Sequence, residues 1–445
     1  MVVSLTRNPS VSHRFICFRM SAPPAARSAH PKAPGFSPDQ RFVVAVLAFL
    51  QFTIVLDFMV LSPLGAILMP ALAIGPKQFG LVVSVYAIAA AVSGLLAAGF
   101  ADRYDRKKFL LFFYAGFLVG TVFCGLAPTY PLLLAARVVT GLFGGVVGAA
   151  AFAIVADVFP LGQRGRVMGL IMTAFGASQV LGIPIGIILA THFGWHAPFL
   201  MIAGVGLAVG VLIVVRMPPV DSHLAVTRGQ HPGRHLWKTA TSARYGVGFM
   251  ATMLLATGGF MLMPFASAFT VNNQHITIDR LPILYVITGV CSLILGPLIG
   301  GLSDRFGKYA TFCVASTIVI AVVLYYTQLE NAPLGEMIVV SVVMFACVTG
   351  RMTAAGALMS AVPAPPDRGA YMSISSSLQQ MAGGGASYLA GLLVYQGPSG
   401  RLEHYPRIGV AVSVATVLTM FLMYRVHKLV PEPAQAAGSI ATPAA

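Results

Sequence analysis

One acidic and one basic residue stand inside long apolar runs, where they could exchange protons. Asp57 lies in Thr53-Ile-Val-Leu-Asp57-Phe-Met and is the only carboxylate well inside any apolar run. An unpaired charge in lipid costs several kcal/mol, so Asp57 should be paired, hydrated or protonated. At about 1.5 Å per residue, Asp57 lies about 22 Å from the start of its run, and Arg137 lies about 9 Å from the start of a run entering from the other side. Because the two runs enter from opposite sides of a ~30 Å membrane core, these depths place both residues in the same layer. The matching depths indicate a carboxylate–arginine pair.

A static ion pair that only holds two helices together is the plainer interpretation of Asp57 and Arg137. A carboxylate that pairs with arginine in one conformation and meets water in another changes its proton occupancy. We therefore favour proton coupling over a static pair. The sequence holds no mid-membrane histidine, no Walker-type loop, no metal-binding cluster and no nucleophile constellation. It therefore predicts no cofactor, no metal and no enzyme activity.

Arg351 is the other arginine inside an apolar run, about 22 Å from the start of that run. The second half of the chain offers no mid-membrane acid as its partner. Arg351 could contact backbone carbonyls, pair with Asp57 or bind an anionic part of a substrate, and a structural role is an equal alternative. Two arginines against one carboxylate would favour an anionic cargo if both line a cavity. The remaining candidates for a cavity wall, with simple packing as the alternative, are Gln179, Phe260, Met261, Met263, Gln379 and Gln380.

The elements that must position these residues follow from composition. The chain has 445 residues, of which 57% are apolar and 9% charged, whereas soluble domains carry about 25% charged residues. A membrane-spanning helix needs roughly 20 predominantly apolar residues. An all-α membrane protein with twelve transmembrane helices, six on each side of a polar basic stretch, is therefore predicted. The runs are 42–70, 79–101, 109–127, 131–158, 166–191 and 196–215, then 245–271, 281–302, 309–328, 335–362, 369–395 and 407–427.

The net charge of +15 does not indicate nucleic-acid binding, because the basic residues sit in short segments between apolar runs. Of the 28 lysines and arginines, 22 lie in segments on the side of the termini, which predicts that both termini are cytoplasmic. Met20 is an alternative start. The predicted organisation is a disordered cytoplasmic N-tail over 1–40, six-helix bundles over 41–216 and 244–428, a cytoplasmic linker over 217–243 and a cytoplasmic C-tail over 429–445.

Two loops repeat one pattern about 202 residues apart, which indicates duplication of a six-helix unit. They are Gly99-Phe-Ala-Asp102-Arg103-Tyr-Asp-Arg106-Lys-Lys and Gly301-Leu-Ser-Asp304-Arg305-Phe-Gly-Lys. Both resemble the loop signature G-x-L-A-D-R-x-G-R-K of the major facilitator superfamily, with Asp105 replacing the second glycine of that signature. The resemblance implies two pseudo-symmetric six-helix bundles and a latch that shuts the cytoplasmic side. Ordinary positive-inside loops are the alternative. The implied latch residues are Gly99, Asp102, Arg103, Arg106, Gly301, Asp304 and Arg305.

Two further segments resemble motifs of this family. Arg137 with Gly141 and Gly145 resembles the helix-4 motif R-x-x-x-G-x-x-x-G, whose arginine and a helix-1 acid govern protonation in proton-coupled members. The segment from Gly182 through Pro184 to Gly186 resembles the antiporter signature of the drug and sugar efflux branches, and it looks closest to arabinose- and sugar-efflux-like permeases. The resemblance implies close helix contact across the two halves. Simple helix packing would use the same small residues.

The predicted function is proton-driven efflux of a small organic solute (a sugar, drug or metabolite) across the bacterial inner membrane. Two six-helix halves would rock around a central site in one monomer. The partners are then the solute, protons and the lipid bilayer, with no nucleic acid. One alternative is a proton symporter or uniporter that imports a nutrient, and another is a non-transporting membrane receptor or lipid-handling protein. The sequence does not identify the cargo.

Overall fold

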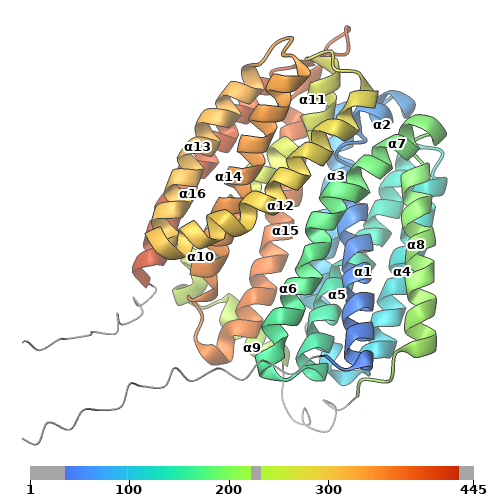
Figure 1. The fold of residues 1–445 in the computed structure, drawn as a ribbon, viewed down its shortest axis with the longest axis vertical. Helices are drawn as coiled ribbons and strands as arrows, with labels where there is room; N and C mark the ends of the chain where they lie inside the picture. The colour runs from blue at the N-terminus through green and yellow to red at the C-terminus, as the bar shows by residue number, and fades with distance from the viewer. Residues whose placement is uncertain (1–35, 98, 222–231, 430–445) are drawn as a thin grey trace, which may run out of the picture. The chain divides into compact units, whose positions relative to one another are not determined.

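A computed structural model describes residues 36–97, 99–221 and 232–429, and nearly all of them are helical (Figure 1). The predicted tails over 1–40 and 429–445 lie almost wholly outside the described residues. The first half contains α1 (Pro38–Val60), α2 (Gly65–Ala71), α3 (Pro76–Ala97), η1 (Ala101–Arg103), α4 (Arg106–Leu126), α5 (Tyr130–Val158), α6 (Leu161–Ala177), the π-helical turn η2 (Ser178–Gly182), α7 (Ile183–Phe193) and α8 (Ala197–Arg216).

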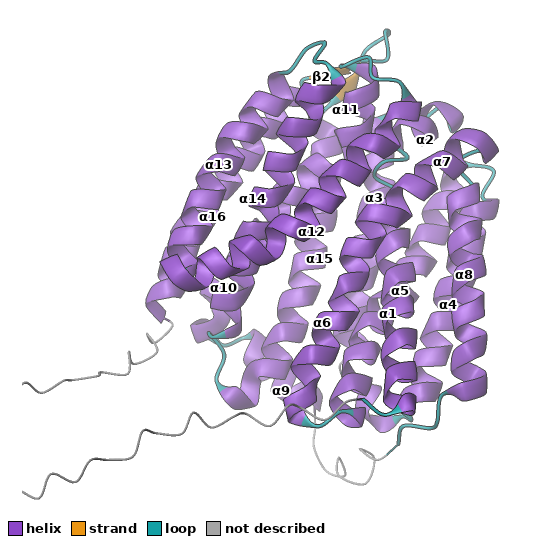
Figure 2. Cartoon of the chain, viewed as in Figure 1, coloured by secondary structure: helices purple, strands orange, loops and turns teal. Residues whose placement is uncertain are grey.

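The second half repeats this order. It contains α10 (Ala243–Leu262), η4 (Met263–Phe265), α11 (Ala266–Asn272), η5 (Ile278–Arg280), α12 (Leu281–Phe306), α13 (Lys308–Gln328), α14 (Leu334–Ser360), η6 (Pro365–Asp367), α15 (Arg368–Leu393) and α16 (Tyr405–Leu429). A short antiparallel hairpin of β1 (Tyr395–Gln396) and β2 (Leu402–Glu403) joins the last two helices (Figure 2). The all-α membrane fold in two six-helix halves is confirmed.

Of the twelve predicted spans, eleven in the described part of the chain are long and apolar enough by length and composition to cross a membrane. The twelfth is α15, which has 26 residues and is rich in serine, glycine and glutamine. Its length suffices for a ~30 Å hydrocarbon core. Its polarity is tolerated because α15 packs against α3 of the first half and α10 of the second.

The two halves share a hydrophobic core at one end only. We call the end where α1 begins and α16 finishes the termini end, and the other the opposite end. The shared core joins residues such as Phe79 of α3 and Phe265 of η4 near the opposite end. Toward the termini end the core divides into one cluster made wholly from the first half and another made wholly from the second. The halves therefore share one hydrophobic core at the opposite end and have separate cores toward the termini end, although α3 and α15 remain close there, with a Cβ at Gly94 3.9 Å from the Ser377 hydroxyl.

Three spans are interrupted near the opposite end, each beside a proline. Pro63 follows the end of α1, Pro264 lies in η4 between α10 and α11, and Pro184 follows the π turn η2. Proline lacks the backbone N–H that an α-helix needs, so the helix breaks or widens there. Pro63 and Pro264 occupy corresponding places in the duplicated halves. The breaks in the first and seventh spans therefore lie where the halves meet.

The predicted linker over 217–243 contains a helix that its sequence did not suggest. Residues 232–240 form α9 (Pro232–Ala240), while 222–231 lie outside the described residues. Leu236 packs against the core of the second half, and Thr239 is buried. His235 lies 3.5 Å from Asp367, which also accepts a hydrogen bond from Tyr245. These contacts fasten the end of the linker to the second half.

Candidate functional site

The predicted pairing of Asp57 and Arg137 is present in the structure. Nη1 of Arg137 donates to Oδ2 of Asp57 at 2.8 Å, and both side chains have no exposed surface. The carboxylate comes from α1 and the guanidinium from α5, so the pair ties two helices of the first half together. A charge pair that is fully desolvated needs good geometry to offset the cost of burial. The short contact meets that requirement.

Two further side chains complete the surroundings of this pair. The hydroxyl of Thr121 on α4 donates to the other carboxylate oxygen, Oδ1, at 3.3 Å. The ring of Tyr86 on α3 lies 4.3 Å from Cζ of Arg137, in a cation–π contact. The Nε and Nη2 atoms of Arg137 have no hydrogen-bond partner among the described residues. Four helices thus enclose one carboxylate and one guanidinium that keeps unused donors.

The glycines of the Arg137 motif set the distance between α5 and α3. A Cβ atom at Gly141 would lie 2.4 Å from the carbonyl oxygen of Tyr86, and one at Gly145 would lie 2.3 Å from that of Ala90. Neither contact is possible for a real side chain, so only glycine permits this approach. The close packing holds Tyr86 under Arg137. The glycines of the motif therefore help to place Tyr86 against the arginine of the ion pair.

The glycines of the helix-5 motif do not face the second half, and the expected contact across the halves is wrong for them. A Cβ at Gly182 would lie 2.5 Å from Leu56, and one at Gly186 would lie 2.6 Å from Val60. Both neighbours belong to α1, where they flank Asp57. Because the π turn precedes Pro184, the helix rotates its small residues toward α1. The motif packs behind the ion pair within one half.

Other residues of the fifth span make the contact with the second half. A Cβ at Gly176 would lie 2.3 Å from Leu293 of α12, and one at Gly289 of α12 would lie 2.9 Å from Val180. The candidate Gln179 precedes Val180 in the π turn and is half-buried at this contact. Gln179 therefore lies at the boundary between the halves, as a wall residue would.

Arg351 does not pair with Asp57, whose carboxylate Arg137 already occupies. It lies on α14 with 4% of its surface exposed. Its Nη1 atom donates to the hydroxyl of Thr416 on α16 at 3.2 Å, and Cζ lies 5.9 Å from the ring centroid of Phe312 on α13. No described carboxylate forms an ion pair with it. Arg351 thus points into the core of the second half, and neither buried arginine presents its charge on an open wall.

The remaining cavity candidates divide by burial. Met261 belongs to the shared core with 4% of its surface exposed, so packing is its role in this conformation. Phe260, Met263, Gln379 and Gln380 are half-buried. The backbone carbonyl of Met263 accepts a hydrogen bond from the hydroxyl of Ser62. These four residues, unlike Met261, retain surface for a cargo.

The implied latch is not engaged in the second half. Asp304 and Arg305 are exposed and form no ion pair with a described residue, and a Cβ at Gly301 would meet nothing within 4 Å. Arg103 is also exposed, and Gly99 would approach only the carbonyl of Leu96 in its own segment. The side chain of Asp102 lies outside the described part. The unengaged loop of the second half agrees with the separate cores at the termini end.

One contact near the first latch loop was missed by sequence reasoning. Nε of Arg106 donates to Oδ2 of Asp157 at 3.0 Å, which joins the start of α4 to the end of α5. A carboxylate at the end of an apolar run was the available signal. Tyr86 and Thr121 were also missed, because a tyrosine or threonine in a membrane helix is common and gives no signal alone.

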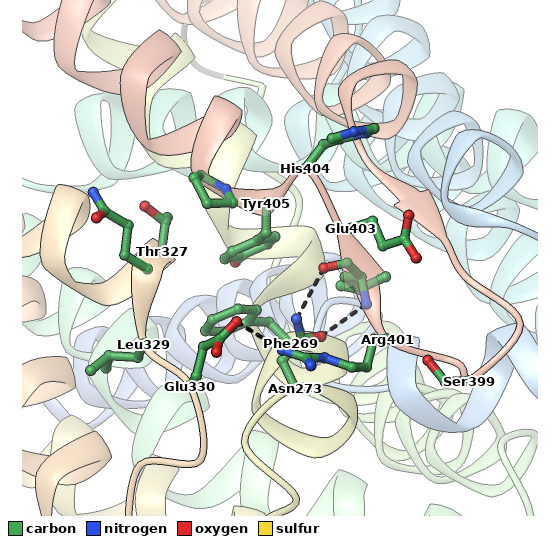
Figure 3. A pocket seen from close by; sticks show the side chains of 13 residues that line it. Phe269, Asn273, Thr327, Leu329, Glu330, Ser399, Arg401, Glu403, His404 and Tyr405 are labelled. Carbon is green, nitrogen blue, oxygen red and sulfur yellow. Dashed lines mark hydrogen bonds and ion pairs between the residues drawn. The ribbon is translucent and has the colours of Figure 1, made fainter.

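A surface pocket of about 440 Å³ lies at the opposite end, away from this site (Figure 3). Phe269 and Tyr405 stack in it with ring centroids 4.1 Å apart, and Arg401 pairs with Glu330 at 3.1 Å. Asn273 exchanges two hydrogen bonds with the backbone of Leu402, which fastens the β-hairpin. All residues lining the pocket belong to the second half. It is a crevice beneath the hairpin, separate from the ion pair.

Comparison with known proteins agrees with this architecture. A family model described as Major Facilitator Superfamily matches residues 47–248 and 248–443. The chain is 29% identical over 264 residues to the uncharacterized MFS-type transporter YceJ of Bacillus subtilis, covering 59% of this chain and 66% of YceJ. It is 30% identical over 216 residues to the methylenomycin A resistance protein of Streptomyces coelicolor, covering 48% of this chain and 45% of that protein.

Among solved structures, the chain resembles a bacterial homolog of the human lysosomal transporter Spinster in an inward-facing, unoccupied conformation. The TM-score is 0.73 at 16% identity, covering 89% of this chain and 98% of that one. At 16% identity this similarity is evidence for the fold alone. The family model covers both six-helix halves, so its match extends over the ion pair and both latch loops. The chain is therefore a multi-pass membrane transporter and not an enzyme, and it belongs to the Major Facilitator Superfamily.

Proposed function

We propose that this transporter exports a small organic solute in exchange for protons, with both termini in the cytoplasm. The observation that carries the proposal is the Asp57–Arg137 pair, which is the only carboxylate–arginine pair among the described residues whose two side chains are both fully buried. In the proposed orientation, the termini end, where the two halves have separate hydrophobic cores, is the cytoplasmic end. The structure would then be the inward-open form, with Asp57 ionised and held by Arg137.

The proposed cycle uses the pair as a proton switch. In the outward-open form water reaches Asp57, which takes a proton and loses its attraction to Arg137. Cargo leaves outward as the halves rock. In the inward-open form Arg137 recovers the carboxylate and the proton departs into the cytoplasm. No cofactor is required, because the proton gradient supplies the free energy, and one monomer holds every group that the cycle uses.

Export is favoured over import by the relatives. The similarity to the methylenomycin A resistance protein supports efflux, since a membrane transporter can confer resistance by removing a compound from the cell. We no longer expect an anionic cargo, because Arg137 and Arg351 are both buried and neither charge faces an open cavity wall. Half-buried Phe260, Gln379 and Gln380 support an amphipathic, uncharged cargo instead.

The test begins with a resistance and metabolite-export screen on cells that overexpress the chain, beside cells that express Asp57→Asn. A compound exported by the first strain is then followed in everted vesicles under an imposed pH gradient. We expect the gradient to drive uptake into vesicles with the unaltered protein and not with Asp57→Asn. Normal gradient-driven transport by Asp57→Asn would overturn the mechanism. Transport in the opposite direction would establish the import alternative.

A further inference from the structure

A series of ring contacts leads from the buried ion pair to the second half of the molecule. Tyr86 lies under Arg137 at 4.3 Å, and the ring centroid of Phe58 lies 5.5 Å from that of Tyr86. Phe58 in turn lies 5.6 Å from Phe260 of α10. Because Phe58 follows Asp57 directly in α1, any movement of the carboxylate's backbone also moves this ring.

Phe260 is fixed to a third helix of the interface. A Cβ at Gly383 of α15 would lie 2.7 Å from the Phe260 ring, so the ring rests directly on the α15 backbone. The hydroxyl of Ser387, one turn further, donates to the Phe260 carbonyl at 3.0 Å. Since α15 packs against both α3 and α10, a displacement of Phe260 reaches the whole interface.

A second ring contact between the halves provides a comparison. Phe79 of α3 lies 5.9 Å from Phe265 of η4, and both are fully buried in the shared core. Neither ring touches the ion pair. Phe58 and Phe260 are only half-buried, and Phe260 packs against the shared core from its edge. The two contacts thus share one chemistry and differ in their connection to Asp57.

We propose that Phe58 is a positioning residue that transmits the state of the Asp57–Arg137 pair to α10. The proposal rests on proton coupling and deepens it. With the pair intact, Arg137 fixes Tyr86, which holds Phe58 against Phe260. In the outward-open form a proton on Asp57 releases Arg137, Tyr86 loses its cation and Phe58 no longer holds Phe260, which frees the second half to rock.

Few groups can compete with Asp57 as the origin of such a response. The titratable and charged groups around it are Arg137 from α5, Tyr86 from α3 and Cys124 from α4. None of them lies on α10 or α15. A response to pH that Asp57→Asn abolishes therefore originates at the carboxylate.

The test needs no cargo, because it measures the distance between the halves. Spin labels are placed at Lys108→Cys and Lys308→Cys, two exposed positions at the termini end, one in each half, with the native cysteines replaced. Pulsed electron paramagnetic resonance then gives the distance distribution in lipid nanodiscs from acidic to alkaline pH. We expect acid and Asp57→Asn each to shift the population ratio by about fivefold or more.

Phe58→Leu should fold, and its distance distribution should respond neither to acid nor to Asp57→Asn. Phe58→Tyr keeps the ring and should respond as the unaltered protein does. Phe79→Leu is the matched control, and it should alter the resting distribution yet keep the response. If Phe58→Leu does not fold, Phe260→Leu removes the same contact from the other side and should abolish the response in the same way.

Two results separate the proposals. If neither pH nor Asp57→Asn moves the distances in the otherwise unaltered protein, proton coupling itself is wrong. If both move them, and Phe58→Leu or Phe260→Leu responds in full, the role of Phe58 is overturned while proton coupling stands. An unresponsive Phe79→Leu would also overturn it, because any contact between the halves would then suffice.

Discussion

The Oδ2 atom of Asp57 lies 2.8 Å from Nη1 of Arg137, with neither side chain exposed. Each residue alone would be a costly charge in the membrane, whereas together they form a unit of zero net charge. Thr121 and Tyr86 occupy two of its sides, and the Nε and Nη2 donors of Arg137 have no partner in the described part of the chain. Changes to either charge should therefore affect stability as well as transport.

Arg137→Met should destabilise the protein by about 3–5 kcal/mol, because it leaves a buried carboxylate without its partner. The double variant with Asp57→Asn removes both charges and should recover most of that loss. Thermal unfolding in detergent measures both variants. A double variant as unstable as Arg137→Met alone would show that packing of the arginine, rather than its charge, is what the site requires.

Arg351→Met should behave in the opposite way. Arg351 is buried and pairs with no described carboxylate, and replacement of buried ionic groups by apolar side chains of similar volume is often neutral or stabilising by about 1–4 kcal/mol. We expect unchanged or raised thermal stability and unchanged export of a compound found in the screen. Loss of export by a variant that still folds would indicate that Arg351 binds the cargo. The variant Arg351→Gln, which keeps a donor, would then show whether charge is needed.

Gly145→Ala should destabilise the first half by about 1–3 kcal/mol, because its Cβ would lie 2.3 Å from the Ala90 carbonyl. Backbone on both sides prevents easy relief of this overlap. Gly204→Ala on α8 is the matched control, since a Cβ there meets nothing within 4 Å. The control should be neutral or gain about 0.5–1 kcal/mol from the lower entropy of its unfolded chain. Equal melting temperatures for the two variants would contradict the close approach of α5 and α3.

Ser267→Ala should make the opposite end open more often. The Ser267 hydroxyl donates to the carbonyl of Ser62 at 3.0 Å, and the hydrogen bonds that join described residues of the two halves all involve Ser62. A bond of this kind contributes about 0.6 kcal/mol in a membrane protein, which corresponds to about threefold in population. Alkylation of Ala268→Cys, a fully buried position nearby, by a membrane-impermeant thiol reagent reports the opening. Ser360→Ala, which removes a bond within one helix, should leave the rate unchanged.

The helices could be predicted closely because bilayer thickness fixes their length and apolarity marks them. The run over 131–158 became α5 (Tyr130–Val158), and the run over 309–328 became α13 (Lys308–Gln328). The break beside Pro63 was not predicted, since the apolar pattern continues through it. The short α9 was missed because it has only nine residues and lies within a polar, basic stretch.

The candidate site could be predicted only in part. Depth along two helices was sufficient to pair Asp57 with Arg137, because the membrane restricts both residues to one layer. Depth does not tell which way a helix face turns. The glycines Gly182 and Gly186 therefore met α1 rather than the second half, and Arg351 met α16 rather than a cavity. Those directions are set by the packing of all twelve spans.

The polarity of α15 has a consequence for how the protein is made. Eleven described spans have the length and apolar composition of membrane-crossing helices, and α15 is less apolar than they are. Its two main packing partners, α3 and α10, are both synthesised before it and already stand in the bilayer when it emerges from the ribosome. Insertion of α15 therefore depends on the packing surface that α3 and α10 provide. A defect in α3 or α10 should appear first as failed biogenesis of the complete chain.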